Sequence, residues 1–122
     1  PAEVEARARS CFDEESYAEL DGHVARYAEN RDLLLRRLPE LGLGSFAPPD
    51  GAFYAWCDIS HLTDDSLRWC QEVLAATGVA LTPGVDFDTA HGNQWVRLSF
   101  AGGTGEIDEA LDRLDASGLL RA

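Results

Sequence analysis

Arg97 is the residue whose type and position most directly suggest binding chemistry, because it lies inside the otherwise apolar run of residues 95–100. In an extended strand, alternation places Trp95, Arg97 and Ser99 on one face and the intervening apolar residues on the other. The Arg97 side chain then either points to solvent, where one of the 22 acidic residues can pair with it, or serves a ligand. As a ligand site, its guanidinium fork would grip a carboxylate or phosphate through two parallel hydrogen bonds. Periodicity alone favours the solvent-exposed alternative.

The cysteines and histidines give weaker signals. Cys57, His61 and Cys70 could ligate a metal, but their spacing matches no common zinc pattern. Both of these cysteines occupy apolar positions, where cysteine behaves as a small hydrophobic residue. Cys11 and His23 could pair as nucleophile and base, yet the acids that would support them are scattered along helix faces. We therefore expect no metal site and no hydrolase-like active site.

A glycine-rich segment, Gly102-Gly103-Thr104-Gly105, follows one predicted strand and precedes a predicted helix. Helix N-termini bind phosphates through free N–H groups, so this segment could form a phosphate loop. Its spacing is neither that of a dinucleotide-binding motif nor that of a P-loop. We expect an ordinary turn with Thr104 as the helix cap.

The composition excludes several classes of function. All ten basic residues are arginine, so chemistry that needs a side-chain amine, such as Schiff-base formation, cannot occur within this chain. The net charge of −12 argues against binding to nucleic acid and to anionic membranes. No apolar run approaches the ~18 residues of a spanning helix, and the charged first ten residues predict no signal peptide. The odd number of cysteines favours a reducing, cytoplasmic location.

Hydrophobic periodicity predicts the helices. Residues 3–41 have a helical composition, with a break near residues 11–16 and one apolar stripe formed by Leu20, Val24, Tyr27, Leu34, Leu38 and Leu41. A second helix is expected over about residues 65–77, capped by Thr63 or Asp64, with an apolar face of Leu67, Cys70, Val73, Leu74 and Thr77. A final helix begins at Thr104 and turns Ile107, Ala110, Leu111 and Leu114 inward.

Strands are expected at residues 45–47, 52–59, 79–81 and 95–100, with an irregular loop at residues 85–94. The resulting order is long helix, strand, strand, helix, strand, strand, helix. This order predicts an α+β, or two-layer α/β, domain in which helices pack on a small mixed sheet of about four strands. At this length, residues 1–122 should form one domain, with residues 1–15 as a linker or an extra helix.

Four sequence blocks together resemble the C-terminal part of class I and II aminotransferases. They occur in the right order and at the right spacing, and the resemblance covers about residues 15–120. The blocks are Tyr27-x-x-Asn30-Arg31-Asp32-x-Leu34-Leu35, Pro49-x-Gly51-Ala52-Phe53-Tyr54-x-Trp56, Gly78-Val79-Ala80-x-Thr82-Pro83-Gly84-x-x-Phe87 and Val96-Arg97-Leu98-Ser99-Phe100-Ala101.

The resemblance implies a small domain beside a large, pyridoxal-phosphate-binding domain. Arg97 holds the position of the arginine that grips the α-carboxylate of the amino acid or 2-oxo acid. The turn at residues 49–54 and the loop at residues 83–87 would face the cleft between the domains. Asp88 stands where the family often has glycine, so the loop and the substrate preference can differ from the family pattern.

In this family the catalytic lysine, the phosphate-binding residues and the groups on the pyridine ring belong to the large domain. We therefore expect substrate binding through Arg97, no catalytic, cofactor-binding or metal residue in this chain, and no activity of the chain alone. The expected partners are the amino acid and 2-oxo acid substrates, the large domain and a second subunit. The alternative is a stand-alone interaction or dimerisation module of the same fold that has lost catalysis.

Overall fold

The helices and strands follow the order expected from the sequence. The computed structural model describes residues 1–121, so Ala122, the last residue of the expected domain, lies outside the described residues. The elements are α1 (Ala2–Ser10), α2 (Glu14–Glu40), β1 (Phe46–Ala47), β2 (Tyr54–Asp58), α3 (Ser66–Thr77), β3 (Thr82–Pro83), β4 (Trp95–Ser99) and α4 (Thr104–Ser117). Two short 3₁₀ turns, η1 (Gly84–Asp86) and η2 (Gly92–Gln94), lie between β3 and β4.

The sheet has the strand order β1-β2-β4-β3 and is antiparallel throughout. The expected α+β class is confirmed, but the sheet is not mixed. A turn connects β1 to β2 and the loop of residues 84–94 connects β3 to β4, and each connection returns the chain in the opposite direction beside its neighbour. The long pairing of β2 with β4 forms the centre, where Trp56 lies opposite Arg97 and Cys57 lies opposite Val96.

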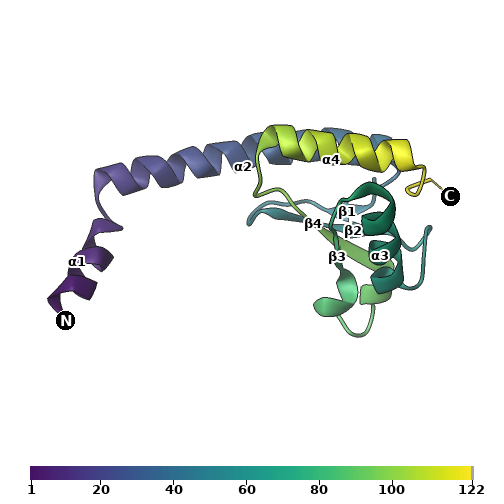
Figure 1. Ribbon diagram of the computed structural model, residues 1–122, viewed down its shortest axis with the longest axis horizontal. Coiled ribbons are helices and arrows are strands. Elements are labelled where there is room, and N and C mark those ends of the chain that lie inside the picture. The colour runs from purple at the N-terminus through teal and green to yellow at the C-terminus, as the bar shows by residue number, and fades with distance from the viewer. Residues whose placement is uncertain (122) are drawn as a thin grey trace.

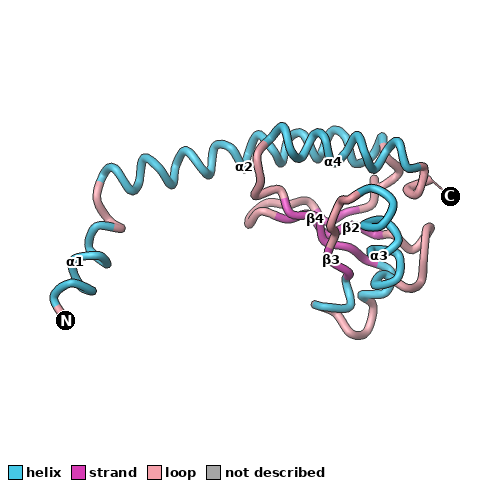
Figure 2. The backbone as a smooth tube through the Cα atoms, in the orientation of Figure 1, coloured by secondary structure: helices cyan, strands magenta, loops and turns pink. Residues whose placement is uncertain are grey.

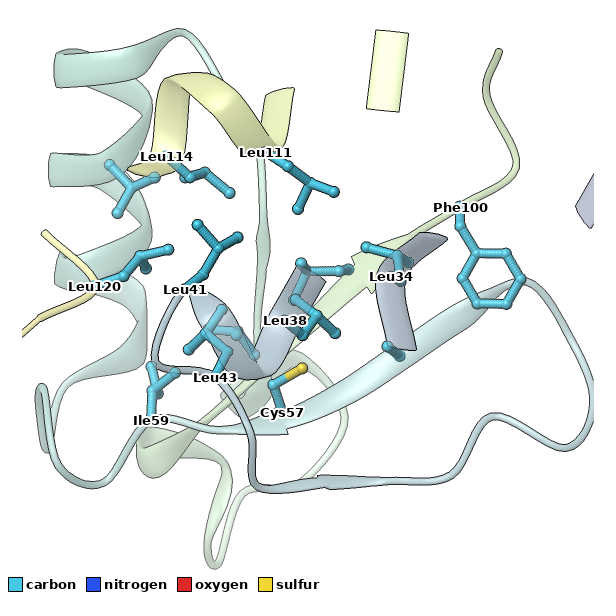
Figure 3. Packing of buried hydrophobic residues seen from close by; sticks show 14 of the residues in the cluster. Leu34, Leu38, Leu41, Leu43, Cys57, Ile59, Phe100, Leu111, Leu114 and Leu120 are labelled. Carbon is cyan, nitrogen blue, oxygen red and sulfur yellow. The ribbon is translucent and has the colours of Figure 1, made fainter. Parts of the chain in front are cut away.

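Helices cover only one face of this sheet. α4 runs beside the C-terminal part of α2 above the strands, and α3 packs near the β3 edge (Figures 1 and 2). Side chains from the covered face of β2 and β4 pack against leucines of α2 and α4 (Figure 3). The largest buried side chains of this core are Leu34, Leu38, Leu43, Ile59, Phe100, Leu111, Leu114 and Leu120. Alternation along the two central strands therefore separates a buried face from an open one.

The N-terminal part of the chain projects away from this core. α1 contains no buried residue, and the first half of α2 extends beyond the sheet (Figure 1). The expected break near residues 11–16 is confirmed, because α1 ends at Ser10 and the Asp13 carboxylate caps α2 by accepting from the Ser16 amide. The apolar stripe of α2 is only half buried: Leu34 and Leu38 are in the core, whereas Leu20 and Val24 are 53% and 63% exposed.

Three local expectations were wrong. The short strand near residues 79–81 forms instead at Thr82–Pro83, the segment that pairs with β4. The carboxylate of Asp65 caps α3 by accepting from the Arg68 amide, so neither Thr63 nor Asp64 is the cap. Thr104 does not cap α4, because its hydroxyl donates a hydrogen bond to Asn30 across the fold.

The inner face of α3 is also rotated relative to the expected one. Cys70 and Val73 are buried as expected, but Leu67 and Leu74 are each 49% exposed. Trp69 is buried in their place, because the helix turns its indole toward the core. In α4, Leu111 and Leu114 are buried as expected and Ile107 packs at the margin.

Asn30 is the buried polar residue that joins the helices to the end of β4. Its amide nitrogen donates to the carbonyl oxygens of Phe100 and Gly102, each at 2.9 Å, and its amide oxygen accepts from the Thr104 hydroxyl at 2.6 Å. These bonds fix the turn between β4 and α4 against the middle of α2. Without the Asn30 amide, these two carbonyls and the hydroxyl would lose their hydrogen-bond partner, and an unpaired buried polar group is unfavourable.

No helix of the described residues is long and apolar enough to cross a membrane.

We predict that Asn30→Ala destabilises the chain by about 2–4 kcal/mol, because it leaves two carbonyls and one hydroxyl without their partner. Urea unfolding followed by circular dichroism measures the change. Glu29→Ala, at the exposed neighbouring position, should change the free energy of unfolding by less than about 0.5 kcal/mol. Equal effects of the two substitutions would contradict the role given to Asn30.

Candidate functional site

Arg97 lies on the open face of the sheet, at the middle of β4. Its strand neighbours are Trp56 on β2 and Thr82 on β3. Val96 and Leu98 are buried on the opposite face, whereas Trp95, Arg97 and Ser99 are partly or fully exposed. The alternation expected from the sequence is thus confirmed. A side chain at this position is anchored by two flanking strands, so its base is held on a rigid element.

Aromatic side chains surround the Arg97 guanidinium. Its central carbon lies 4.4 Å from the ring centroid of Phe87 and 5.0 Å from that of Tyr54. Together with Trp56 and Asp88, these residues line an open pocket of about 280 Å³. The Trp56 ring meets Phe87 edge-on at 6.4 Å and stacks on Trp95 at 5.8 Å. The pocket is therefore a mainly aromatic hollow with one cation in it.

Arg97 forms no ion pair with any acid within residues 1–121. Its Nε atom is buried and lacks a hydrogen-bond partner within the same part of the chain. Arg37, by contrast, bonds Asp108 at 2.7 Å and Asp112 at 2.8 Å between α2 and α4. A guanidinium carries five N–H donors in a planar fork. The Nη groups of Arg97, which are not engaged by an acid of the described residues, are available to a planar anion such as a carboxylate.

The loop of residues 84–94 brings Phe87 to Arg97. Gly84 and Gly92 lie so close that a Cβ atom on either would collide with backbone atoms of the other. The Gly84 carbonyl accepts from the amides of Phe87 and Asp88, at 3.0 and 2.9 Å. The absence of side chains at the two glycines therefore permits the tight closure that turns Phe87 back over the sheet.

Asp88 contributes the second charge of the pocket. Its Oδ1 accepts hydrogen bonds from the amides of Ala90 at 2.9 Å and His91 at 3.1 Å. These bonds, to His91 first and then Ala90, lower the pKa of the Asp88 carboxyl below its usual range. Asp88 is therefore ionised at neutral pH. Its bonds lie within the loop, so Asp88 braces the turn.

The alternative sites weighed from the sequence do not assemble. The described residues contain no group of three or more histidine, cysteine or acidic side chains that could hold a metal. Burial raises the pKa of Cys57 to about 12 and, with the charge of Asp86, that of Cys70 to about 11. Cys11 is exposed at the end of α1, where its thiol contacts the Arg7 carbonyl.

The glycine-rich segment 102–105 is likewise a turn. The Gly102 carbonyl accepts from Asn30, and Gly103 is the N-cap residue of α4, which has no side-chain cap. The sequence placed Trp95 on the same face of the strand as Arg97, but it did not assign Tyr54 or Trp56 to the Arg97 site. Their signal was the two-residue period of β2 and β4, which places them on the same face as Arg97 once the two strands pair.

Both the sequence and the structure of this chain match known proteins. The family described as aminotransferase class I and II matches residues 4–114. A valine–pyruvate aminotransferase of Mycobacterium tuberculosis is 52% identical over 114 residues, which are 93% of this chain and 29% of that protein. An aspartate aminotransferase of Pyrococcus abyssi is 33% identical over 90% of this chain and 28% of its own length.

Solved structures agree with the sequence matches. The crystal structure of an aminotransferase from Mycobacterium tuberculosis aligns with a TM-score of 0.86 and 53% identity, over 88% of this chain and 28% of that one. The structure of an aspartate aminotransferase from Thermus thermophilus with maleate aligns with a TM-score of 0.72 and 39% identity, over 84% of this chain and 25% of that one. The chain thus spans less than a third of the length of the proteins it matches.

We predict that only Cys11 reacts rapidly with a thiol reagent at about pH 8. The raised pKa values keep the Cys57 and Cys70 thiols protonated there, and both are buried, so they should react only when the chain unfolds. Counting the thiols modified in buffer and in denaturant checks this, with Cys11→Ser as the control that removes the fast phase. Rapid modification of two or more thiols in the folded chain would contradict the prediction.

Proposed function

Because the chain belongs to the class I and II aminotransferase family, we propose that it is the small, substrate-carboxylate-binding domain of such an enzyme. The enzyme would transfer an amino group between an amino acid and a 2-oxo acid. The chain spans 29% of the length of the 52% identical relative, which supports a division of labour with a large domain outside this sequence. That large domain and a second subunit would complete the active site.

The observation that carries the proposal is the unpaired guanidinium of Arg97 in an aromatic pocket. Every amino donor and every 2-oxo acceptor of this reaction carries one carboxylate next to the reacting carbon. A planar guanidinium binds such a group through two parallel hydrogen bonds, which fix its orientation as well as its position.

Binding by Arg97 would orient the substrate for chemistry done elsewhere. When the carboxylate is fixed in one plane, rotation about its bond to Cα is the main freedom that remains. Interactions with the large domain can then align the Cα–H bond for cleavage. We assign this chain a share in binding and orientation, and no proton transfer.

The residues of this chain do not fit a covalent site for pyridoxal phosphate, the cofactor on which the family depends. The sequence contains no lysine, and the pocket of Arg97 offers one cation, the Asp88 carboxylate and aromatic walls. The cofactor site of the proposed enzyme would therefore lie in the large domain.

The relatives are named for different substrates, and these substrates share the α-carboxylate. The 52% identical relative is named a valine–pyruvate aminotransferase, and others are named aspartate and LL-diaminopimelate aminotransferases. The carboxylate beside the amino group is common to all of these substrates.

We predict that Arg97→Ala in the intact enzyme lowers kcat/KM by a factor equivalent to about 2–5 kcal/mol of activation free energy, because it leaves the substrate carboxylate without its partner. Arg97→Lys keeps the charge but loses the planar fork, so its kcat/KM should lie between those of the wild type and Arg97→Ala. Cofactor occupancy should remain unchanged. Arg68→Ala, at an exposed α3 position, serves as the control. Near-normal efficiency of Arg97→Ala, or loss of the cofactor with unchanged substrate affinity, would contradict the proposal.

We also predict that the 122-residue chain alone has no transaminase activity and forms no covalent adduct with pyridoxal phosphate, since it has no lysine. Visible absorption spectra recorded after mixing and dialysis check this. The intact enzyme, treated identically, is the positive control. A stoichiometric absorption band that survives dialysis of the short chain would disprove the prediction.

A further inference from the structure

We propose that Tyr54 and Phe87 are positioning residues that hold the Arg97 guanidinium ready for a carboxylate. This inference rests on the proposed function of Arg97 and adds the means by which its side chain is held. We refer to these two rings as the aromatic clamp.

The clamp is assembled from two separate elements. Tyr54 begins β2 opposite Ser99, two residues from Arg97 along β4, so the pair is diagonal on one face of the sheet. Phe87 reaches the same point from the loop that Gly84 and Gly92 close. The Arg97 guanidinium carbon lies 5.0 and 4.4 Å from the two ring centroids, within the range of cation–π attraction.

The clamp compensates for the unfavourable burial of part of the Arg97 guanidinium. The Nε atom of Arg97 is buried without a hydrogen-bond partner in the described part of the chain. A buried, unpaired donor is unfavourable, and a cation is more so. Each ring face presents negative charge to the guanidinium, which stabilises the cation without a counter-ion.

The use of rings instead of an acid has a functional consequence. A carboxylate from the protein would occupy the N–H groups of Arg97 and compete with the substrate. Asp88 lines the same pocket, but its Oδ1 accepts from two loop amides and it forms no ion pair with Arg97. The two aromatic rings restrict the Arg97 side chain without engaging the N–H groups that a substrate carboxylate would bind. The clamp therefore pre-organises Arg97 and reduces the entropy lost on substrate binding.

The supporting contacts indicate that Phe87 is itself held in place. Trp56 meets Phe87 edge-on at 6.4 Å, and Trp56 in turn stacks on Trp95 with ring planes only 9° apart. Phe87 is nevertheless 58% exposed and Tyr54 is 40% exposed. Their replacement removes little of the core, so substitution at either position tests the site more than the fold.

The test is a kinetic comparison in the intact enzyme. Tyr54→Leu and Phe87→Leu should each raise KM for the amino acid and for the 2-oxo acid about 3- to 30-fold, the scale of one cation–π contact, with a smaller change in kcat. Tyr54→Phe and Phe87→Tyr keep the rings and should restore KM to near the wild-type value. Phe12→Leu removes an exposed ring between α1 and α2, away from the clamp, and should leave KM unchanged.

A double-substitution cycle separates this inference from the function of Arg97. In the Arg97→Ala background, Tyr54→Leu and Phe87→Leu should have no further effect on KM, because the clamp acts through Arg97. If Arg97→Ala raises KM but the leucine variants do not, or if their effects persist in that background, the clamp is wrong and the proposed function stands. If Arg97→Ala itself leaves KM unchanged, the proposed function fails and the clamp fails with it.

Discussion

The candidate site depends on one interaction: the Arg97 guanidinium lies against two aromatic rings, and no acid within residues 1–121 pairs with it. A partly buried cation needs compensation, and the usual compensation is an ion pair such as the one between Arg37 and the two aspartates of α4. Arg97 has Tyr54 and Phe87 instead. The arrangement is stable enough to form and still leaves hydrogen-bonding capacity that a carboxylate can use.

The one-sided cover of the sheet makes this arrangement possible. β2 and β4 present alternate residues to the helices and to the open face, so the same ten residues supply both core and pocket. Core packing on one side fixes the strands, and Asn30 fixes the turn where β4 ends. The site therefore inherits its rigidity from leucines and a buried amide on the far side of the sheet.

The sequence predicted the features that depend on local periodicity. The two-residue alternation in β4 placed Arg97 on the open face, and helical spacing identified the C-terminal part of α2 and the inner face of α4. It failed where tertiary contacts decide the outcome. Thr104 has the composition of a cap but bonds Asn30, 74 positions away in the chain. Leu20 and Val24 continue the apolar stripe of α2 beyond the point where anything in the described residues covers them.

The aromatic surroundings of Arg97 could be recognised only in part. Tyr54 and Trp56 share its face once β2 and β4 are paired, but neither the pairing register nor the return of Phe87 is encoded locally. That return depends on the close approach of Gly84 and Gly92, whose significance appears only when the loop is closed. Asp88 was recognised as a departure from the family glycine, and the structure shows it bracing the loop through the amides of Ala90 and His91.

The central claim is that Arg97 recognises the carboxylate beside the reacting carbon. The most direct measurement compares the single-turnover rates of the intact enzyme and its Arg97→Ala variant with an amino acid and with the corresponding amine that lacks the carboxylate. The account predicts that the substitution slows the amino acid reaction about 30-fold or more, equivalent to about 2 kcal/mol, and leaves the slow amine reaction unchanged. An equal loss with both substrates, or no loss with the amino acid, would contradict it.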